Sequence, residues 1–193
     1  MEGRLIKNRY RLDSRLGEGS MGVVYKAFDL TEQRVVALKI ADLTAHPESA
    51  ARFQAEAKTM LGLSHPHIVA VFEAGHDDGV HYMVMEYLDG RSLGQMLPVA
   101  IPDAVAFAVQ ISAALEYAHR QGIVHRDIKP ANLMVLPTGG GISGPLVKVM
   151  DFGLARRLHD QFELNESGAL VGTAAYISPE QALGQRIDVC SDL

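Results

Sequence analysis

Apolar and polar residues alternate over several short stretches in the first 90 residues, which is the pattern of strands packed on one face. It predicts strands at Tyr10–Leu16, Val23–Asp29, Val35–Ile40, Ile68–Glu73 and Val80–Glu86, with a turn at 76–79 between the last two. Between the third and fourth strands, residues 47–62 follow helical spacing, opening at Pro47 and closing near Gly62. The N-terminal part is therefore expected to be a small sheet with one helix.

The pattern changes at 87–92, where the β-rich stretch ends. Residues 103–121 then follow the spacing of a long apolar helix. We expect its stripe to lie in the core; the stripe comprises Val105, Ala108, Ser112, Leu115 and His119. Short β-like pieces flank turns at 130–150, and the Gly-rich stretch 138–145 is expected to form a surface hairpin. The fold class is therefore α+β, with one domain at 1–88 and a mostly helical one at 89–193.

Composition narrows the class of protein. The 193 residues are 48% hydrophobic and 21% charged, as in a globular chain that needs no disulfide to fold, and the net charge of −5 argues against nucleic-acid binding through bulk charge. The lone Cys190 fits a reducing compartment. No apolar run approaches the roughly 18 residues of a membrane helix, and the start is charged where a signal peptide would be apolar. We expect a cytoplasmic chain, or the cytoplasmic part of a longer membrane-anchored protein.

The glycines of Gly17-Glu18-Gly19-Ser20-Met21-Gly22 suggest a phosphate-binding loop, although an ordinary glycine turn has the same composition. In a dinucleotide-binding fold such glycines open a helix. Here Val23–Phe28 follows, a β-branched run too short for that helix. The glycines are therefore expected to cap a hairpin whose N–H groups can approach phosphates, which argues against a Rossmann oxidoreductase.

Lys39 lies in an otherwise apolar strand and, taken alone, is most simply an outward-facing lysine. The helix at 47–62 changes this interpretation, because Glu56 sits at the edge of its apolar arc and would lose hydration unless a cation met it. That arc contains Ala50, Phe53, Ala57, Met60 and Leu61. Lys39 is a candidate partner, and a Lys39–Glu56 pair would hold the ammonium for phosphate oxygens.

The second half adds His125-Arg126-Asp127-Ile128-Lys129-Pro130-Ala131-Asn132 and Asp151-Phe152-Gly153. In this order the chain resembles a eukaryotic-type protein serine/threonine kinase catalytic domain, in particular its bacterial members. The matching pieces are LGEGSMGVVY (16–25), VALK (36–39), Glu56, MVMEYLDG (83–90), HRDIKPAN (125–132), DFG (151–153) and GTAAYISPE (172–180). The resemblance runs from about Arg9 to the end of the chain.

The resemblance implies a two-lobed kinase fold with a β-rich N-lobe, and transfer of the γ-phosphoryl group of Mg-ATP to protein Ser or Thr hydroxyls. The resemblance implies that Asp127 is the catalytic base and that Lys129 contacts the γ-phosphate. It also implies that Lys39, held by Glu56, contacts the α- and β-phosphates. Asn132 and Asp151 match the residues that bind Mg²⁺. The residues it assigns to ATP are Leu16, Gly17, Gly19, Gly22, Val24, Ala37, Lys39, Met85, Glu86 and Leu88. The implied partners are ATP and protein substrates, with no nucleic acid and no membrane contact from this segment. A dimer would permit autophosphorylation.

The family's activation loop corresponds to 151–180. Arg126 matches an arginine that pairs with a phosphate on this loop, and Ser167 is the candidate phosphosite. Thr173 matches a threonine that bonds near the catalytic base. Asp192 matches the aspartate that anchors the catalytic loop.

Departures from the family pattern keep a second interpretation open. Ser178 replaces the usual Ala, and the chain stops where a central helix begins, so the incomplete C-lobe lacks the arginine that pairs with Glu180. The alternative function is an inert kinase fragment or a pseudokinase-type nucleotide-binding module. Two histidine features are read as structural: His65-Pro66-His67 as a loop rather than a zinc site, and His125 as a packing residue rather than a base.

Overall fold

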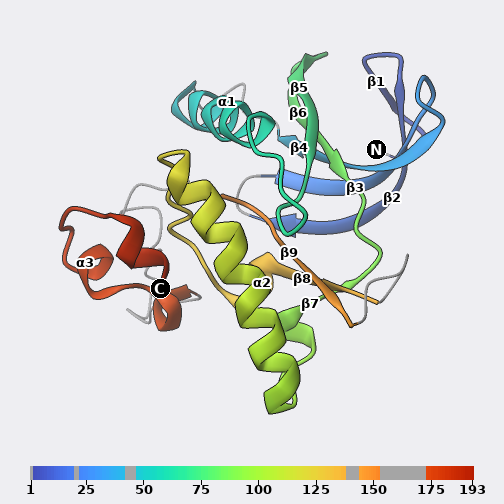
Figure 1. The fold of residues 1–193 in the computed structure, drawn as a ribbon. Coiled ribbons are helices and arrows are strands. Elements are labelled where there is room, and N and C mark those ends of the chain that lie inside the picture. Colours follow the sequence, from blue (N-terminus) through green and yellow to red (C-terminus); the bar gives the residue numbers. More distant parts are fainter. Residues whose placement is uncertain (1, 20–21, 42–46, 138–143, 153–172) are drawn as a thin grey trace, which may run out of the picture. The chain divides into compact units, whose positions relative to one another are not determined.

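The computed structural model describes residues 2–19, 22–41, 47–137, 144–152 and 173–193. The chain forms two compact units (Figure 1). The first unit contains the residues up to Ser64 together with Val69–Leu88, and the second contains His65–Ile68 and Asp89–Leu193. The short segment His65–Ile68 thus belongs to the second unit although both of its neighbours in sequence belong to the first.

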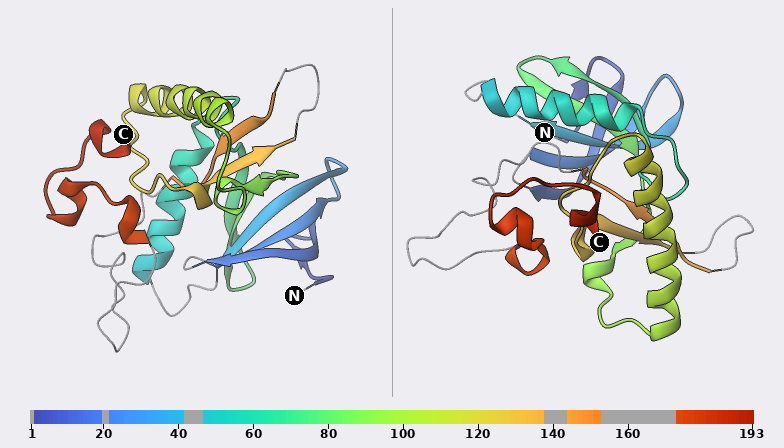
Figure 2. Two further views of the ribbon diagram at one scale, coloured as in Figure 1. Left: turned by 90° about the horizontal axis from the view of Figure 1, so that it is seen from below. Right: turned by 60° about the vertical axis from the view of Figure 1, so that its left-hand side comes forward.

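The first unit is built on an antiparallel sheet of six strands in the order β1-β2-β3-β4-β6-β5 (Figure 2). Its strands are β1 (Leu5–Ile6), β2 (Tyr10–Gly19), β3 (Gly22–Asp29), β4 (Arg34–Ala41), β5 (Val71–Asp77) and β6 (Val80–Glu86). The expected strands at 10–16, 23–29, 35–40 and 80–86 are all present, with small extensions.

The expected strand at 68–73 is displaced. β5 begins at Val71 and continues to Asp77, so that the turn is only Asp78-Gly79, both with positive φ (42° and 77°). Ile68 instead forms an isolated parallel bridge with Val149. A local alternation pattern cannot distinguish a strand residue from a buried loop residue that pairs with a distant segment.

One face of the sheet and the helix α1 (Pro47–Leu61) form a small apolar cluster of Ala41, Phe53, Ala57 and Met83. The other face carries the larger core, which contains Ile6, Tyr10, Leu12, Tyr25, Ala27, Val36, Leu38, Ile40, Val80, Tyr82 and Val84. The predicted helix at 47–62 is therefore confirmed, with Phe53 and Ala57 on its buried side.

The second unit contains the long helix α2 (Ile101–Arg120) and a three-stranded sheet in the order β7-β8-β9 (Figure 1). The strands are β7 (Arg91–Ser92), β8 (Leu133–Leu136) and β9 (Leu146–Val149), and α2 packs on β9. A short helix, α3 (Pro179–Ala182), and several 3₁₀ turns complete it. Among the helices in the described part of the chain, none combines the length and apolar character needed to cross a membrane.

The helix expected at 103–121 is present, and the predicted buried stripe is right at Leu115 but wrong at Val105, Ala108 and Ser112. The buried residues of α2 are Phe107, Ala114, Leu115 and Ala118, whereas Val105 is 59% exposed and Ala108 and Ser112 are also exposed. Apolar residues lie around most of this helix, so more than one stripe satisfies the helical spacing. Packing against other segments, β9 among them, selects the buried face.

Candidate active site

In the first unit, the glycines close the β2–β3 hairpin, whose last pair is Gly19↔Gly22. Gly22 has a φ of +122°, and a Cβ atom there would lie 2.1 Å from the carbonyl oxygen of Ile40. Any other residue would therefore be disfavoured by contact with β4 and by backbone strain. A Cβ at Gly17 or Gly19 would meet nothing within 4 Å. The strand β3 follows the glycines directly, as expected for a hairpin and not for a dinucleotide-binding helix.

Lys39 on β4 and Glu56 on α1 form a buried ion pair, with 3.4 Å between Nζ and Oε1. The two side chains are 9% and 3% exposed. Two isolated charges would be strongly unfavourable at this depth, so each stabilises the other. The sequence-based expectation that Glu56 meets Lys39 therefore agrees with the geometry.

Strand register places Lys39 among the residues expected to contact a nucleotide. Val24 pairs with Lys39, and Ala37 pairs with Met85. Because cross-strand partners and residues two apart share a face of a sheet, Val24, Ala37, Lys39 and Met85 line one face.

The other expected nucleotide residues lie at the ends of strands. Leu16 is 48% exposed on β2. Glu86 ends β6, and its N–H donates to the carbonyl oxygen of Ala70 at 2.9 Å. Its N–H is thus committed within the first unit, so a contact from the Glu86 backbone to a ligand would use the carbonyl. Leu88 is the last residue of this unit.

In the second unit, two side chains converge on Asp127. The ammonium of Lys129 lies 2.9 Å from Oδ2 and 3.1 Å from Oδ1 of Asp127. The amide nitrogen of Asn132 donates to the backbone carbonyl of Asp127 at 2.8 Å and to its Oδ2 at 3.0 Å. The carboxylate is thereby fixed in orientation by charge-assisted hydrogen bonds.

The loop that carries Asp127 is held by Asp192. The carboxylate of Asp192 accepts hydrogen bonds from the N–H groups of His125 (2.8 Å) and Arg126 (2.7 Å). Nε2 of His119 on α2 lies 2.7 Å from Asp192 Oδ2. The side chain of Gln181 on α3 donates to the carbonyl of Arg126 at 2.8 Å. These contacts support Arg126 at a φ of 68°, a conformation that a non-glycine residue adopts only when its surroundings impose it.

His125 is fully buried beneath this loop. Its Nε2 lies 2.9 Å from the carbonyl oxygen of Met150, and its ring centroid is 4.6 Å from that of Phe152. Burial lowers the pKa of His125, so the ring stays neutral near pH 7. The geometry of His125 agrees with a packing residue. Asp127 is then the candidate base of this loop.

Asn132 and Asp151 are the two residues expected to hold a metal. They lie on adjoining segments, since the N–H of Met150 donates to the carbonyl of Asn132 at 2.9 Å. Asp151 is exposed with a φ of 51°, and Asn132 donates through its amide nitrogen to Asp127, which directs its amide oxygen elsewhere. A carboxylate and an amide oxygen are the donors that Mg²⁺ prefers, so this pair fits the ion.

The remaining predicted positions are only partly described. Ser20, Gly153 and Ser167 lie outside the described residues. Thr173 begins a 3₁₀ turn, Thr173–Tyr176. Glu180, expected to lack its arginine here, is hydrogen-bonded by the hydroxyl of Ser191.

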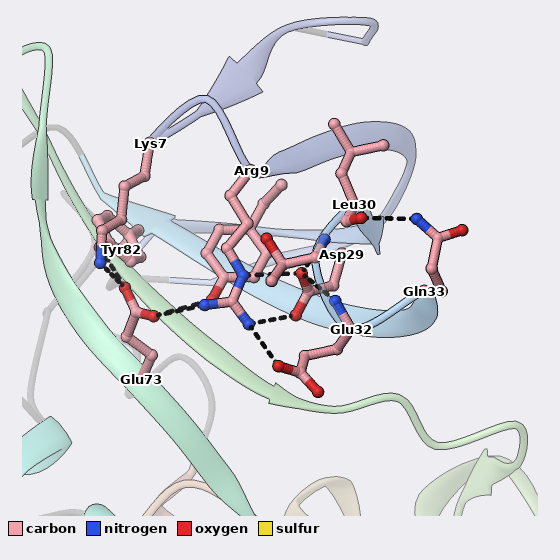
Figure 3. Close-up of polar contacts among 10 residues, drawn as sticks. Lys7, Arg9, Asp29, Leu30, Glu32, Gln33, Glu73 and Tyr82 are labelled. Carbon is pink, nitrogen blue, oxygen red and sulfur yellow. Dashed lines mark hydrogen bonds and ion pairs between the residues drawn. The ribbon is translucent and has the colours of Figure 1, made fainter.

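Sequence reasoning missed a charged cluster in the first unit (Figure 3). The guanidinium of Arg9 binds both oxygens of Asp29 at 2.7 Å, and this contact lowers the pKa of Asp29 to about 2. Glu73 accepts hydrogen bonds from the hydroxyls of Tyr10 (2.9 Å) and Tyr82 (2.7 Å). The cluster fastens the start of the chain to β3 and β5. Glu73 lies more than 60 residues from Arg9 and Tyr10 in sequence, a contact that no local pattern reveals.

A curled antiparallel sheet with one helix, a glycine hairpin, a buried Lys–Glu pair and an Asp–Lys–Asn loop together define the protein kinase fold. The chain belongs to the protein kinase domain family, whose model matches residues 10–193.

Its relatives include a probable serine/threonine-protein kinase of Streptomyces coelicolor, 45% identical over 203 residues, which cover 100% of this chain and 29% of that protein. The serine/threonine-protein kinase PknB of Mycobacterium tuberculosis is 41% identical over 202 residues, covering 97% of this chain and 31% of PknB. The chain thus spans about 30% of the length of these curated relatives. The crystal structure of the Mycobacterium tuberculosis PknI kinase domain matches with a TM-score of 0.71 at 28% identity, covering all of this chain and 72% of that one.

Proposed function

We propose that this protein is an ATP-dependent protein serine/threonine kinase. The observation that carries the proposal is the convergence of Lys129 and Asn132 on Asp127, on a loop whose backbone is held by Asp192. Phosphoryl transfer depends mainly on positioning and on neutralising charge, and this arrangement supplies both.

Asp127 is the proposed catalytic base. Its carboxylate would accept the proton of a substrate Ser or Thr hydroxyl as the bond from that oxygen to the γ-phosphorus forms and the bond from phosphorus to the β–γ bridging oxygen breaks. Lys129 orients the Asp127 carboxylate, and its ammonium would also contact the γ-phosphate.

The first unit is the proposed nucleotide-binding part. Lys39, held by Glu56, would contact the α- and β-phosphates, and the hairpin of Gly17, Gly19 and Gly22 would cover them. The adenine ring would lie against a surface of the first unit; the residues proposed for it are Leu16, Val24, Ala37, Met85, Glu86 and Leu88. The strand register that places several of these on one face with Lys39 supports this assignment.

Asn132 and Asp151 would hold Mg²⁺, which supplies positive charge to the phosphate oxygens when bound. In domain terms, residues 1–88 would form the N-lobe and 89–193 part of the C-lobe.

Regulation and location are further parts of the proposal. Arg126 has a buried Nε without a partner among the described residues, which supports a role in pairing with a phosphate on the 151–180 loop, with Ser167 as acceptor and Thr173 near the base. We also propose that the substrates are proteins and that a dimer permits autophosphorylation. The proposed location is the cytoplasm, where ATP is available.

The test has two stages. Binding of Mg-ATP, present at about 100 times its dissociation constant, should add roughly 2.7 kcal/mol to the free energy of unfolding. Thermal unfolding with and without Mg-ATP measures this effect. Transfer of labelled phosphate to a Ser/Thr-containing protein substrate should follow, and should be absent with a substrate whose hydroxyl residues are replaced by Ala. Nucleotide binding without any transfer would contradict the kinase assignment and leave a nucleotide-binding module.

A further inference from the structure

Two histidines face each other near the tip of the β5–β6 hairpin. The strands end in the pair Asp77↔Val80, and the pair next to it is His76↔His81. Asp78 and Gly79 form a two-residue turn, so the pair that flanks the turn is hydrogen-bonded and the His76–His81 pair is the non-hydrogen-bonded kind. Side chains approach each other most closely at such a pair.

The two imidazole rings are 4.9 Å apart between centroids, at an interplanar angle of 64°. Two imidazoles bound to one zinc ion, with Zn–N bonds of about 2.0–2.1 Å at a near-tetrahedral angle, place their centroids roughly 5 Å apart. The spacing of the rings therefore matches that of a metal-bound pair.

His81 has an unsatisfied nitrogen. The residue is 8% exposed, and its Nδ1 has no hydrogen-bond partner among the described residues. A buried polar atom without a partner is unfavourable, and a ligand that fills this position removes that cost. His76 is exposed, so an ion can reach the pair from solvent.

The surroundings keep His81 in the form that binds metals. Its ring lies 6.0 Å from that of Phe53 on α1, on the face of the sheet that carries Met83. Burial, with a smaller contribution from His76, lowers the pKa of His81. Of the charged groups nearby, the carboxylate of Asp77 accepts the N–H of Lys7. A neutral imidazole is the ligand form of histidine.

A second histidine pair in the molecule provides a contrast. The rings of His65 and His67 are 5.5 Å apart, but Nδ1 of His65 lies 3.2 Å from the N–H of His67, and Nδ1 of His67 lies 3.0 Å from the carbonyl oxygen of Val147. Both rings are thus engaged with backbone groups, unlike His81.

We propose that His76 and His81 form a two-histidine site for a divalent transition-metal ion such as Zn²⁺, whose other coordination positions are taken by water. No group of three or more His, Cys, Asp or Glu residues suited to a metal occurs in the described part of the chain, so this pair acts without a third side-chain ligand. The site is separate from the proposed Mg²⁺ ligands Asn132 and Asp151 and uses softer nitrogen donors.

The test is a calorimetric titration of the untagged, nucleotide-free protein with Zn²⁺ at about pH 7.5, repeated at about pH 5.5. We expect saturable binding of one ion and weaker binding at the lower pH, because protons compete with a metal ion for imidazole nitrogens. In parallel, NMR should show the ring resonances of His76 and His81 moving on titration.

The variant H76A removes an exposed ligand and should weaken zinc binding at least about tenfold, with an unchanged thermal midpoint without metal. The matched control is H67A, which alters the other histidine pair and should leave zinc affinity unchanged. Equal affinity in H76A and the parent protein, absence of saturable binding to the parent, or movement of the His65 and His67 resonances instead would overturn the proposal.

Discussion

In the first unit Lys39 meets Glu56 at 3.4 Å, whereas in the second unit Asp127 is surrounded by hydrogen bonds of 2.8 to 3.1 Å and its loop is tied to Asp192 at 2.7 and 2.8 Å. Charge-assisted hydrogen bonds are usually about 2.7–2.9 Å long. The Asp127 carboxylate of the second unit is therefore held by two side chains on a loop whose backbone is itself anchored, while the Lys39 ammonium of the first unit contacts Glu56 between a strand and a helix.

The difference has a physical origin. Loop residues 125–127 do not belong to a strand ladder, so their N–H groups need other acceptors. The buried carboxylate of Asp192 accepts two of them, from His125 and Arg126. Lys39 already lies on a strand whose backbone is satisfied in the sheet, and only its long side chain needs to be oriented. A carboxylate held rigidly in this way suits a reaction in which the proton-accepting group must be aligned accurately.

The largest effect is expected for D127N. The amide keeps the shape and the contact with Asn132 but cannot take a proton, so the transfer rate should fall about 10²–10⁴-fold with little change in the thermal midpoint. Phosphate transfer and thermal unfolding are measured together. D103N, in the first turn of α2, is the control and should retain activity. Near-normal transfer by D127N would mean that another group is the base.

The second prediction addresses the loop anchor. D192A leaves the N–H groups of His125 and Arg126 without their acceptor, so we expect the free energy of unfolding to fall by roughly 3 kcal/mol and transfer to be lost. Urea unfolding measures the first effect. An unchanged urea midpoint would show that other contacts hold the loop. The loop anchor would then no longer distinguish the second unit from the first.

The third prediction concerns the hairpin of the first unit. G22A brings a Cβ against the carbonyl of Ile40 and strains a positive φ, so it should lower the free energy of unfolding by about 2 kcal/mol and weaken Mg-ATP binding. G19A is the matched control, because its Cβ meets nothing within 4 Å, and should change stability by less than about 0.5 kcal/mol. Equal effects at both positions would contradict this distinction.

The smallest effect is expected for the charged cluster of the first unit, and it depends on pH. The pKa of Asp29 is lowered to about 2 by Arg9 from an ordinary value of 3.8, so its stabilisation is fully present above about pH 4 and is lost as the pH falls toward 2. D29N should be less stable than the parent at pH 7 and should lose less stability between about pH 4 and 2. Parallel pH profiles of urea unfolding for the two proteins would show that folding does not change the pKa of Asp29.

Much of the fold and of the site could be predicted from the sequence, because local signals carry it. The strand that follows Gly22 excludes a dinucleotide-binding fold. The position of Glu56 on an apolar arc predicts that a cation partners its carboxylate. The strands β3, β4 and β6 follow from alternation in the sequence, whereas their order in the sheet does not.

The rest depends on contacts between distant segments. Gln181 holds the carbonyl of Arg126 from more than 50 positions away, and Ile68 pairs with Val149. The Asp192 anchor was implied by the family resemblance and not by any local pattern. The buried face of α2 was predicted only in part for a similar reason, since it packs against β9, which is distant in sequence.

The four residues His65–Ile68 have a consequence for protein engineering. They lie between segments of the first unit, yet the N–H of Val149 donates to the carbonyl of His67, and Ile68 bridges the same strand residue. A gene cut after Leu88 would therefore separate β9 from a neighbour encoded upstream of the cut. Chimeras between relatives should exchange His65–Ile68 together with β9, because the modular boundary in space is not a single point on the chain.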